Sequence, residues 1–295
     1  MFQFLPCGKN TYYLRCFSNI GVYDLGNGEA VLIDSGDHKK SVSDLDKALT
    51  ERGLRVRMII NTHGHIDHIH GNRFFKEKYS CKVYAPQIEQ YFVEESAVEP
   101  SYYYNGIPTN RARNFFFRPL GTPCERLTED VLPPGFALLP LPGHSHNMVG
   151  VKTPDDVWFL ADALVDRATF EEYKLPAFMD INKSIETARM LETLDGAFFV
   201  PSHSAATDDI APLARYNAEM LLQRKAFFRT LCTGKSFEEI FAAACEALPM
   251  SMDLDKYAKV STTVKCFLQS LLEDGTVTAE IDGCVPKYVQ IEKEP

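Results

Sequence analysis

The segment Thr62–His68, with the sequence Thr-His-Gly-His-Ile-Asp-His, constrains this chain more than any other feature. Four of the eight histidines lie between His63 and His70, immediately after the continuous apolar run Met58-Ile59-Ile60. Such a run is typical of a strand buried on both faces. Side chains two residues apart point the same way on an extended chain but not on a helix. We therefore expect a loop between a strand and a helix, in which His63 and His65 face one way and the chain then turns.

Three more side chains that could bind a metal have a similar local setting, at the end of an apolar strand followed by a break. His144 follows Leu139–Gly143, Asp162 follows Trp158–Ala161, and His203 follows Phe198–Ser202. A rigid scaffold presents ligands on one rim in this way, because loops at strand ends carry binding side chains. The combined donor set contains nitrogen and oxygen but no thiolate. It suits Zn²⁺, and also Fe²⁺ or Mn²⁺.

The remaining pattern alternates strands with helices, which predicts an α/β fold. Hairpin strands are expected early in the chain, followed by a helix at Ser41–Arg52 that ends at Gly53. The segment Ser96–Gly135 shows no regular period and is predicted to be a long ordered insertion or lid. Two of its tyrosines and two of its arginines could bind substrate, or could instead seal the lid and face solvent: Tyr103, Tyr104, Arg111 and Arg113.

The C-terminal region, residues 210–295, reads as helices followed by a two-stranded hairpin. This order suggests a winged-helix-like appendage after a catalytic domain at residues 1–209. The appendage contains ten Lys and Arg against twelve Asp and Glu. It lacks the basic surface expected of a nucleic-acid binder. We therefore expect the appendage to serve in packing or in homodimer formation.

The whole chain has a formal net charge of −9 and no apolar stretch long enough to span a bilayer. The first ten residues lack the features of a signal peptide. The eight cysteines are scattered without a C-x-x-C pair. We therefore expect a cytoplasmic protein with reduced cysteines and no membrane association.

The motif His63-x-His65-x-Asp67-His68 resembles the H-x-H-x-D-H motif of the metallo-β-lactamase superfamily, over roughly residues 1–209. The later His, Asp and His of that family match His144, Asp162 and His203. The resemblance implies an αβ/βα sandwich of two mixed sheets flanked by helices. It also implies two divalent metal ions, most simply Zn²⁺, in a ligand set like that of glyoxalase II.

In that family, residues matching His63, His65 and His144 bind the first ion. Residues matching Asp67, His68 and His203 bind the second, and the residue matching Asp162 bridges the two. Asp34 matches a family position that supports the metal loop from behind, where such partners orient the ligands. The roles of two nearby histidines are not fixed by the motif. His70 is expected to be structural, and His146 is either a loop residue or a substrate contact.

The expected chemistry is hydrolysis by a metal-activated hydroxide, with Asp67 as both ligand and orienting group. Ligands and fold leave the substrate open, and we expect a small-molecule thioester, ester or lactone. The tyrosine that related lactonases carry three residues after the bridging aspartate is absent, because Val165 stands there. Alternatives are a phosphodiesterase or endoribonuclease, an iron-dependent oxygen-using enzyme, and a non-catalytic interaction module.

Overall fold

The computed structural model describes residues 3–95, 97–106 and 121–292. Its contacts group the chain into two compact units. The first contains residues 1–142, 146–164 and 194–210, and the second contains residues 143–145, 165–193 and 211–295.

A seven-stranded mixed sheet forms the centre of the first unit, in the order β1-β2-β3-β4-β5-β6-β7. The first four strands pair antiparallel as successive hairpins, whereas β4 to β7 pair parallel. The change of direction places β5, which leads into the histidine motif, between two parallel neighbours. The strands are β1 (Gln3–Pro6), β2 (Thr11–Arg15), β3 (Ile20–Asp24), β4 (Glu29–Ile33), β5 (Arg55–Ile60), β6 (Lys82–Ala85) and β7 (Glu125–Arg126).

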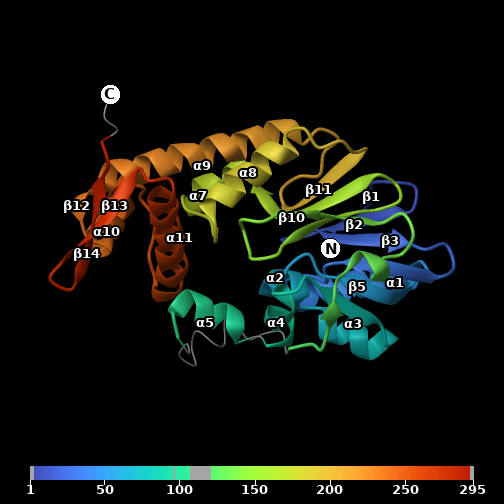
Figure 1. Cartoon of the computed structure of the whole chain (residues 1–295). Coiled ribbons are helices and arrows are strands. Elements are labelled where there is room, and N and C mark those ends of the chain that lie inside the picture. Colours follow the sequence, from blue (N-terminus) through green and yellow to red (C-terminus); the bar gives the residue numbers. More distant parts are fainter. Residues whose placement is uncertain (1–2, 96, 107–120, 293–295) are drawn as a thin grey trace. The chain divides into compact units, whose positions relative to one another are not determined.

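Helices α1 (Lys39–Glu51) and α3 (Asn72–Tyr79) pack against one face of this sheet (Figure 1). Helix α1 buries Val42, Leu45 and Leu49, at the i, i+3, i+7 spacing of an amphipathic helix. These side chains join Phe75 of α3 and inward residues of the sheet in one apolar core. The shorter helices of this region are α2 (Ile66–Ile69), α4 (Glu89–Glu94) and α5 (Val98–Tyr104).

A second sheet of four strands, in the order β11-β10-β9-β8, packs against the other face. Its strands are β8 (Ala137–Pro140), β9 (Val149–Lys152), β10 (Val157–Val165) and β11 (Phe198–His203). Val31, Ile33 and Ile60 of the first sheet form one apolar cluster with Val151 and Phe159 of the second. The first sheet is therefore buried on both faces, as the apolar run of β5 predicts.

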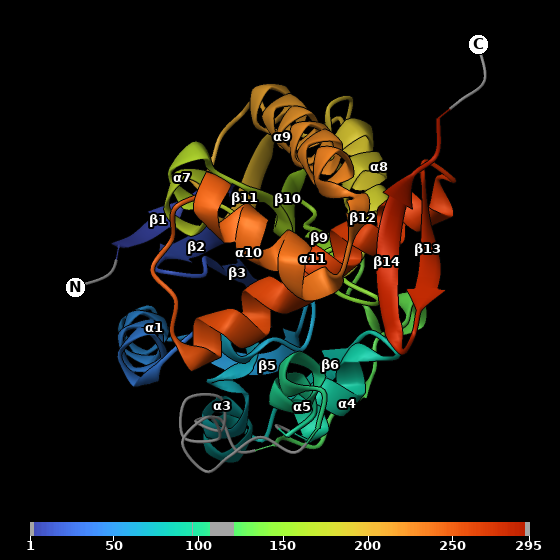
Figure 2. The ribbon, with the colours of Figure 1, turned by 90° about the vertical axis from the view of Figure 1, so that its left-hand side faces the viewer.

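The second unit is mainly helical and closes with a three-stranded sheet in the order β12-β14-β13. Figure 2 shows its β13–β14 hairpin as two long neighbouring arrows. Phe228, Val264 and Phe267 lie in its apolar core, and the rings of Phe228 and Phe267 stack at 4.8 Å. Its elements are α7 (Arg167–Tyr173), α8 (Ile181–Leu191), α9 (Ala211–Leu231), β12 (Thr233–Lys235), α10 (Phe237–Ala247), α11 (Leu254–Glu273), β13 (Val277–Asp282) and β14 (Val285–Gln290).

The predicted α/β class, with mixed sheets and flanking helices, is confirmed, as is a helical C-terminal region. The division into domains at residues 1–209 and 210–295 stays a prediction. The segment Ser96–Gly135 is more regular than expected, because it contains α5, β7 and the short 3₁₀ helix η1 (Glu129–Val131). The helix expected after the loop is present as two helices, because α2 and α3 are separated by His70 and Gly71.

No helix among the described residues is both long and apolar enough to cross a membrane.

Candidate metal centre

The histidine motif follows β5, at the carboxyl end of a strand with parallel neighbours; His63 and His65 lie in the loop, and Asp67 and His68 lie in α2. Gly64 separates the two histidines because there is no room for a larger residue. A Cβ at that position would lie 2.3 Å from Cβ of Phe92 and 2.9 Å from the carbonyl oxygen of Glu89, both in α4. The close packing of α4 on the loop therefore fixes the path of the backbone between His63 and His65.

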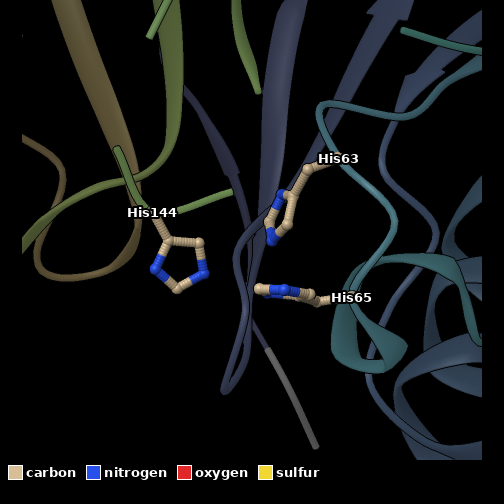
Figure 3. A group of neighbouring side chains, drawn as sticks. All are labelled: His63, His65 and His144. Carbon is tan, nitrogen blue, oxygen red and sulfur yellow. The ribbon is translucent and has the colours of Figure 1, made fainter. Parts of the chain in front are cut away.

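His63, His65 and His144 form a first group of donors. One nitrogen from each ring lies within 4.8 Å of the others. Figure 3 shows the three imidazoles gathered around a common space, with His144 arriving from the loop between β8 and β9. The rings of His63 and His65 meet edge to face with their centroids 4.6 Å apart. Three converging imidazoles are a familiar ligand set for a divalent transition metal.

Asp67, His68, Asp162 and His203 form a second group, with one donor atom from each within 4.8 Å of the others. Asp162 contacts both histidines, since its Oδ1 lies 3.1 Å from Nε2 of His68 and its Oδ2 lies 3.0 Å from Nε2 of His203. The Oδ2 atom of Asp67 lies 3.2 Å from the same nitrogen of His203. Two carboxylates and two imidazoles converge on one point, as the ligands of a metal ion do.

In the metal-free protein, the carboxylates and imidazoles of the second group shift one another's pKa values strongly. Burial lowers the pKa of His203, but Asp162 and Asp67 outweigh it and raise the pKa to about 10. Burial also opposes ionisation of Asp67, yet His68 and His203 hold the pKa of its carboxyl well below its usual range. The two carboxylates, with Asp34, likewise raise the pKa of His68 despite its burial. Protons thus balance the buried negative charge where a metal dication would do so.

Asp34 contacts the loop from its buried side and is itself 2% exposed. Its Oδ1 accepts a hydrogen bond from the backbone N–H of Thr62, and its Oδ2 accepts one from the hydroxyl of Thr62, each at 2.8 Å. The same Oδ2 lies 2.8 Å from Nδ1 of His68. Asp34 has a positive φ of 62°, a strained conformation for a residue with a side chain. The backbone is held there by this network.

Each of four histidines contacts the protein through Nδ1, which directs Nε2 toward the centre. The partners are Thr62 Oγ1 for His63, Asp34 Oδ2 for His68, the carbonyl oxygen of Ala177 for His144 and that of Phe17 for His203. Contacts of this kind fix the orientation of an imidazole and make it a better metal ligand.

Asp162 and His203 do not follow strands in the way expected. Strand β10 continues to Val165, so Asp162 lies inside it, and His203 is the last residue of β11. Ala161, next to Asp162, has a positive φ of 50°. This irregularity within β10 replaces the predicted strand end.

Sequence reasoning missed two buried glutamates that contact the ligand loops. Glu89 of α4 is fully buried, and its carboxylate accepts hydrogen bonds from the backbone N–H groups of Gly64, at 3.0 Å, and Asn147, at 2.9 Å. Glu99 of α5 accepts a hydrogen bond of 3.0 Å from the N–H of Ile66. Nothing local in the sequence marks these residues, because glutamate on a helix is ordinarily exposed.

Ser18 and Asn19, in the turn between β2 and β3, were missed as well. The hydroxyl of Ser18 donates to Oδ2 of Asp67 at 2.6 Å. The side-chain amide of Asn19 donates to the carbonyl oxygens of Pro201 and Ser204, at 2.8 and 3.0 Å, on either side of His203. A serine and an asparagine in a turn are common for conformational reasons alone, so their sequence signal is weak.

The residues predicted to contact substrate differ in their burial and position. Tyr103 is buried, and its pKa is raised by burial, by Glu99 and Tyr102, and by the metal-group carboxylates Asp67 and Asp162. Tyr104 is half-buried at the end of α5. Arg111 and Arg113 lie outside the described residues.

His146 is exposed, and its ring lies near those of Phe92 and Tyr102, at centroid distances of 6.2 and 6.4 Å. Because the ring of Phe92 is itself 6.4 Å from that of His65, these side chains form an aromatic edge beside the first group. His70 belongs to neither donor group, and neither does His38, which caps α1.

A family model for the metallo-β-lactamase superfamily matches residues 13–203 of this chain. The chain belongs to this superfamily. The matched range runs from β2 to the end of β11, and it includes both donor groups.

Relatives and solved structures agree with this membership. The chain is 39% identical over 57 residues to a hydroxyacylglutathione hydrolase from Thiobacillus denitrificans, an alignment that spans 19% of this chain and 21% of that relative. The chain thus spans about a fifth of that curated relative's length.

Two crystal structures share the fold across nearly the whole chain. A β-lactamase domain protein from Burkholderia ambifaria superimposes with a TM-score of 0.74 at 16% identity, covering 98% of this chain and 94% of that one. A metallo-β-lactamase family protein from Thermus thermophilus superimposes with a TM-score of 0.68 at 19% identity, covering 99% and 98%. Similarity at this level of identity concerns the fold alone.

Proposed function

We propose that this protein is a metal-dependent hydrolase that cleaves a small-molecule thioester, ester or lactone. The observation that carries the proposal is the pair of adjacent donor groups, one of three imidazoles and one of two carboxylates and two imidazoles. Burying these residues together without a cation is unfavourable, because two carboxylates repel each other and loss of water destabilises their charged forms.

The residues present fit two divalent metal ions. His63, His65 and His144 would hold one, and Asp67, His68 and His203 would hold the other, with Asp162 shared between them. Nitrogen and oxygen donors without thiolate suit Zn²⁺, Fe²⁺ or Mn²⁺. When bound, such ions supply hydroxide at neutral pH and polarise the bond that is attacked.

The chain's own residues supply the rest of the proposed mechanism. The hydroxyl of Ser18 restrains the carboxylate of Asp67, which lets that carboxylate keep one orientation as a ligand and as an acceptor from a nucleophilic water. Asp34 restrains His68 and the Thr62 backbone in the same way. Tyr103, whose phenol lies in the electrostatic field of Asp67 and Asp162, would donate a hydrogen bond to an oxygen of the substrate. That donor would stabilise the negative charge that develops there.

A thioester ranks first among the substrates because part of the chain resembles a hydroxyacylglutathione hydrolase. The aromatic edge formed by Phe92, Tyr102 and His146 beside His65 offers an apolar surface for an acyl group. Small-molecule sites combine such surfaces with a few directed polar groups.

The test is hydrolysis by protein loaded with Zn²⁺, Fe²⁺ or Mn²⁺ and offered acyl-glutathione thioesters, aryl esters, lactones and bis(p-nitrophenyl) phosphate. We expect thioester turnover that is lost in His63→Ala and Asp67→Asn and kept in His38→Gln, which alters a histidine outside both groups. Turnover of the phosphodiester alone would replace this proposal with a phosphodiesterase. Protein that holds no metal after loading would overturn it.

A further inference from the structure

The two donor groups are held by different buried side chains, Glu89 for the first and Ser18 for the second. Glu89 is fully buried, and each of its carboxylate oxygens accepts a backbone N–H from a different loop. Gly64 lies between His63 and His65, and Asn147 lies three residues after His144. One carboxylate therefore ties together the two loops that supply all three imidazoles of the first group.

Ser18 is 1% exposed and acts on the other group. Its hydroxyl donates to Oδ2 of Asp67 at 2.6 Å, the oxygen that also lies 3.2 Å from Nε2 of His203. The neighbouring Phe17 accepts from Nδ1 of His203 through its carbonyl oxygen. The turn between β2 and β3 thus restrains two of the four donors in the second group.

We propose that Glu89 and Ser18 are positioning residues that set the metal affinities of the first and second groups separately. The inference rests on the proposed dinuclear site. It adds that a different buried residue, outside the ligand set, controls each of the two metal affinities. Glu89 belongs to neither donor group, and Ser18 acts on the second group through its hydrogen bond to Asp67. Each acts by restraining the ligands before the metal arrives, so that less conformational freedom is lost on binding.

The two contacts differ in kind, which makes the effects separable. Glu89→Gln keeps one acceptor oxygen, so one of the two N–H groups, of Gly64 or of Asn147, loses its buried acceptor and the link between the two loops is broken. Without the Ser18 hydroxyl, Asp67 loses the donor that fixes its side-chain rotamer, while the first group keeps its contacts. Buried partners that orient metal ligands typically contribute about 10- to 100-fold in metal affinity.

The experiment measures Zn²⁺ affinity by chelator competition in two single-site backgrounds. His203→Ala leaves the first group intact, and His144→Ala leaves the second. Glu89→Gln and Ser18→Ala are then introduced into both backgrounds. We expect Glu89→Gln to weaken binding about 10- to 100-fold in the His203→Ala background and less than about threefold in the other. Ser18→Ala should show the opposite pattern, so each variant is the control for the other.

Equal weakening in both backgrounds, or no weakening in either, would overturn the inference. Circular dichroism checks folding. If Glu89→Gln does not fold, Glu89→Asp replaces it, because a shorter carboxylate can reach at most one of the two N–H groups. If the His203→Ala and His144→Ala proteins themselves bind no Zn²⁺, the proposed function is rejected as well. If they bind Zn²⁺ and the added Glu89→Gln and Ser18→Ala changes leave the affinity unaltered, only this inference is rejected.

Discussion

Asp34 shows at the scale of a single residue how one buried carboxylate organises several ligands. It accepts from the backbone and the hydroxyl of Thr62, and it contacts Nδ1 of His68. An amide has one acceptor oxygen where a carboxylate has two. The isosteric change to asparagine therefore leaves a buried polar group with an unsuitable partner.

We expect Asp34→Asn to lower the free energy of unfolding of the metal-free protein by about 1–3 kcal/mol, the usual cost of an unsatisfied buried group. Zn²⁺ affinity should fall about 10- to 100-fold, because His68 loses its orienting partner. Urea denaturation and chelator competition measure the two effects. Asp44→Asn, on the surface of α1 where the residue pairs with Lys40, is the matched control and should change neither.

Metal affinity at the second group should depend strongly on pH. In the metal-free protein the pKa of His203 is about 10, and that of His68 is also raised, because Asp162 and Asp67 outweigh the effect of burial. His203 is therefore doubly protonated at neutral pH, the raised pKa of His68 favours the same charged form, and a metal must displace the added protons. Each proton displaced makes the affinity rise about tenfold per pH unit until the pH reaches the pKa.

The measurement is Zn²⁺ competition in the His144→Ala background between about pH 6 and 9, a range below the raised pKa of His203. Affinity should increase with pH throughout this range. A flat profile would contradict the coupled protonation of His68 and His203.

At the scale of elements, α4 and α5 shape the metal loop although they contribute no ligand to either donor group. Helix α4 packs so closely that Gly64 has no space for a side chain, and α5 contacts Ile66 through Glu99. Glu99 and Tyr103 are one helical turn apart in α5, so both face the loop.

We expect Gly64→Ala to disrupt the first donor group. The added Cβ would lie 2.3 Å from Cβ of Phe92 and 2.9 Å from a backbone oxygen, which forces the loop or α4 to move. Zn²⁺ affinity in the His203→Ala background should fall, and the melting temperature should fall with it. Gly106→Ala is the control, because a Cβ added there would meet no atom of the described residues within 4 Å.

Tyr103→Phe tests the hydroxyl that α5 contributes. If the phenol donates to the substrate, its removal should lower kcat on the order of 100-fold, the cost of losing one oxyanion donor, with little change in Zn²⁺ affinity. Tyr91→Phe is the matched control, since Tyr91 lies in the neighbouring α4 and its side chain is exposed. An unchanged kcat in Tyr103→Phe would assign Tyr103 to packing alone.

At the scale of the whole molecule, the candidate ligands come from loops, strands and helix α2, over a sequence range from His63 to His203, so metal binding should stabilise the folded chain. A ligand present at about 100 times its Kd stabilises the folded state by about 2.7 kcal/mol. Removal of metal by a chelator should therefore lower the melting temperature measured by calorimetry. The double variant His144→Ala, His203→Ala should show a much smaller shift, because both groups are then incomplete.

The sequence alone was enough to predict the α/β class and to select seven candidate ligands. The signals that select these candidates are local: four metal-capable residues lie within the six positions His63–His68, and each later candidate accompanies an apolar strand. Spacing of two residues can be read without knowing the fold, because an extended backbone places such side chains on one side.

Only the tertiary structure decided which buried groups surround those ligands. Glu89, Glu99 and Ser18 carry no local mark, and α5 lies in a segment that shows no period. Their positions depend on contacts across long stretches of chain, such as the 58 positions that separate Glu89 from Asn147. A carboxylate becomes a support for a metal loop only when the fold buries it beside backbone N–H groups that need an acceptor. The histidine motif thus identifies the chemistry, whereas the packing of α4, α5 and the β2–β3 turn determines how firmly the ligands are held.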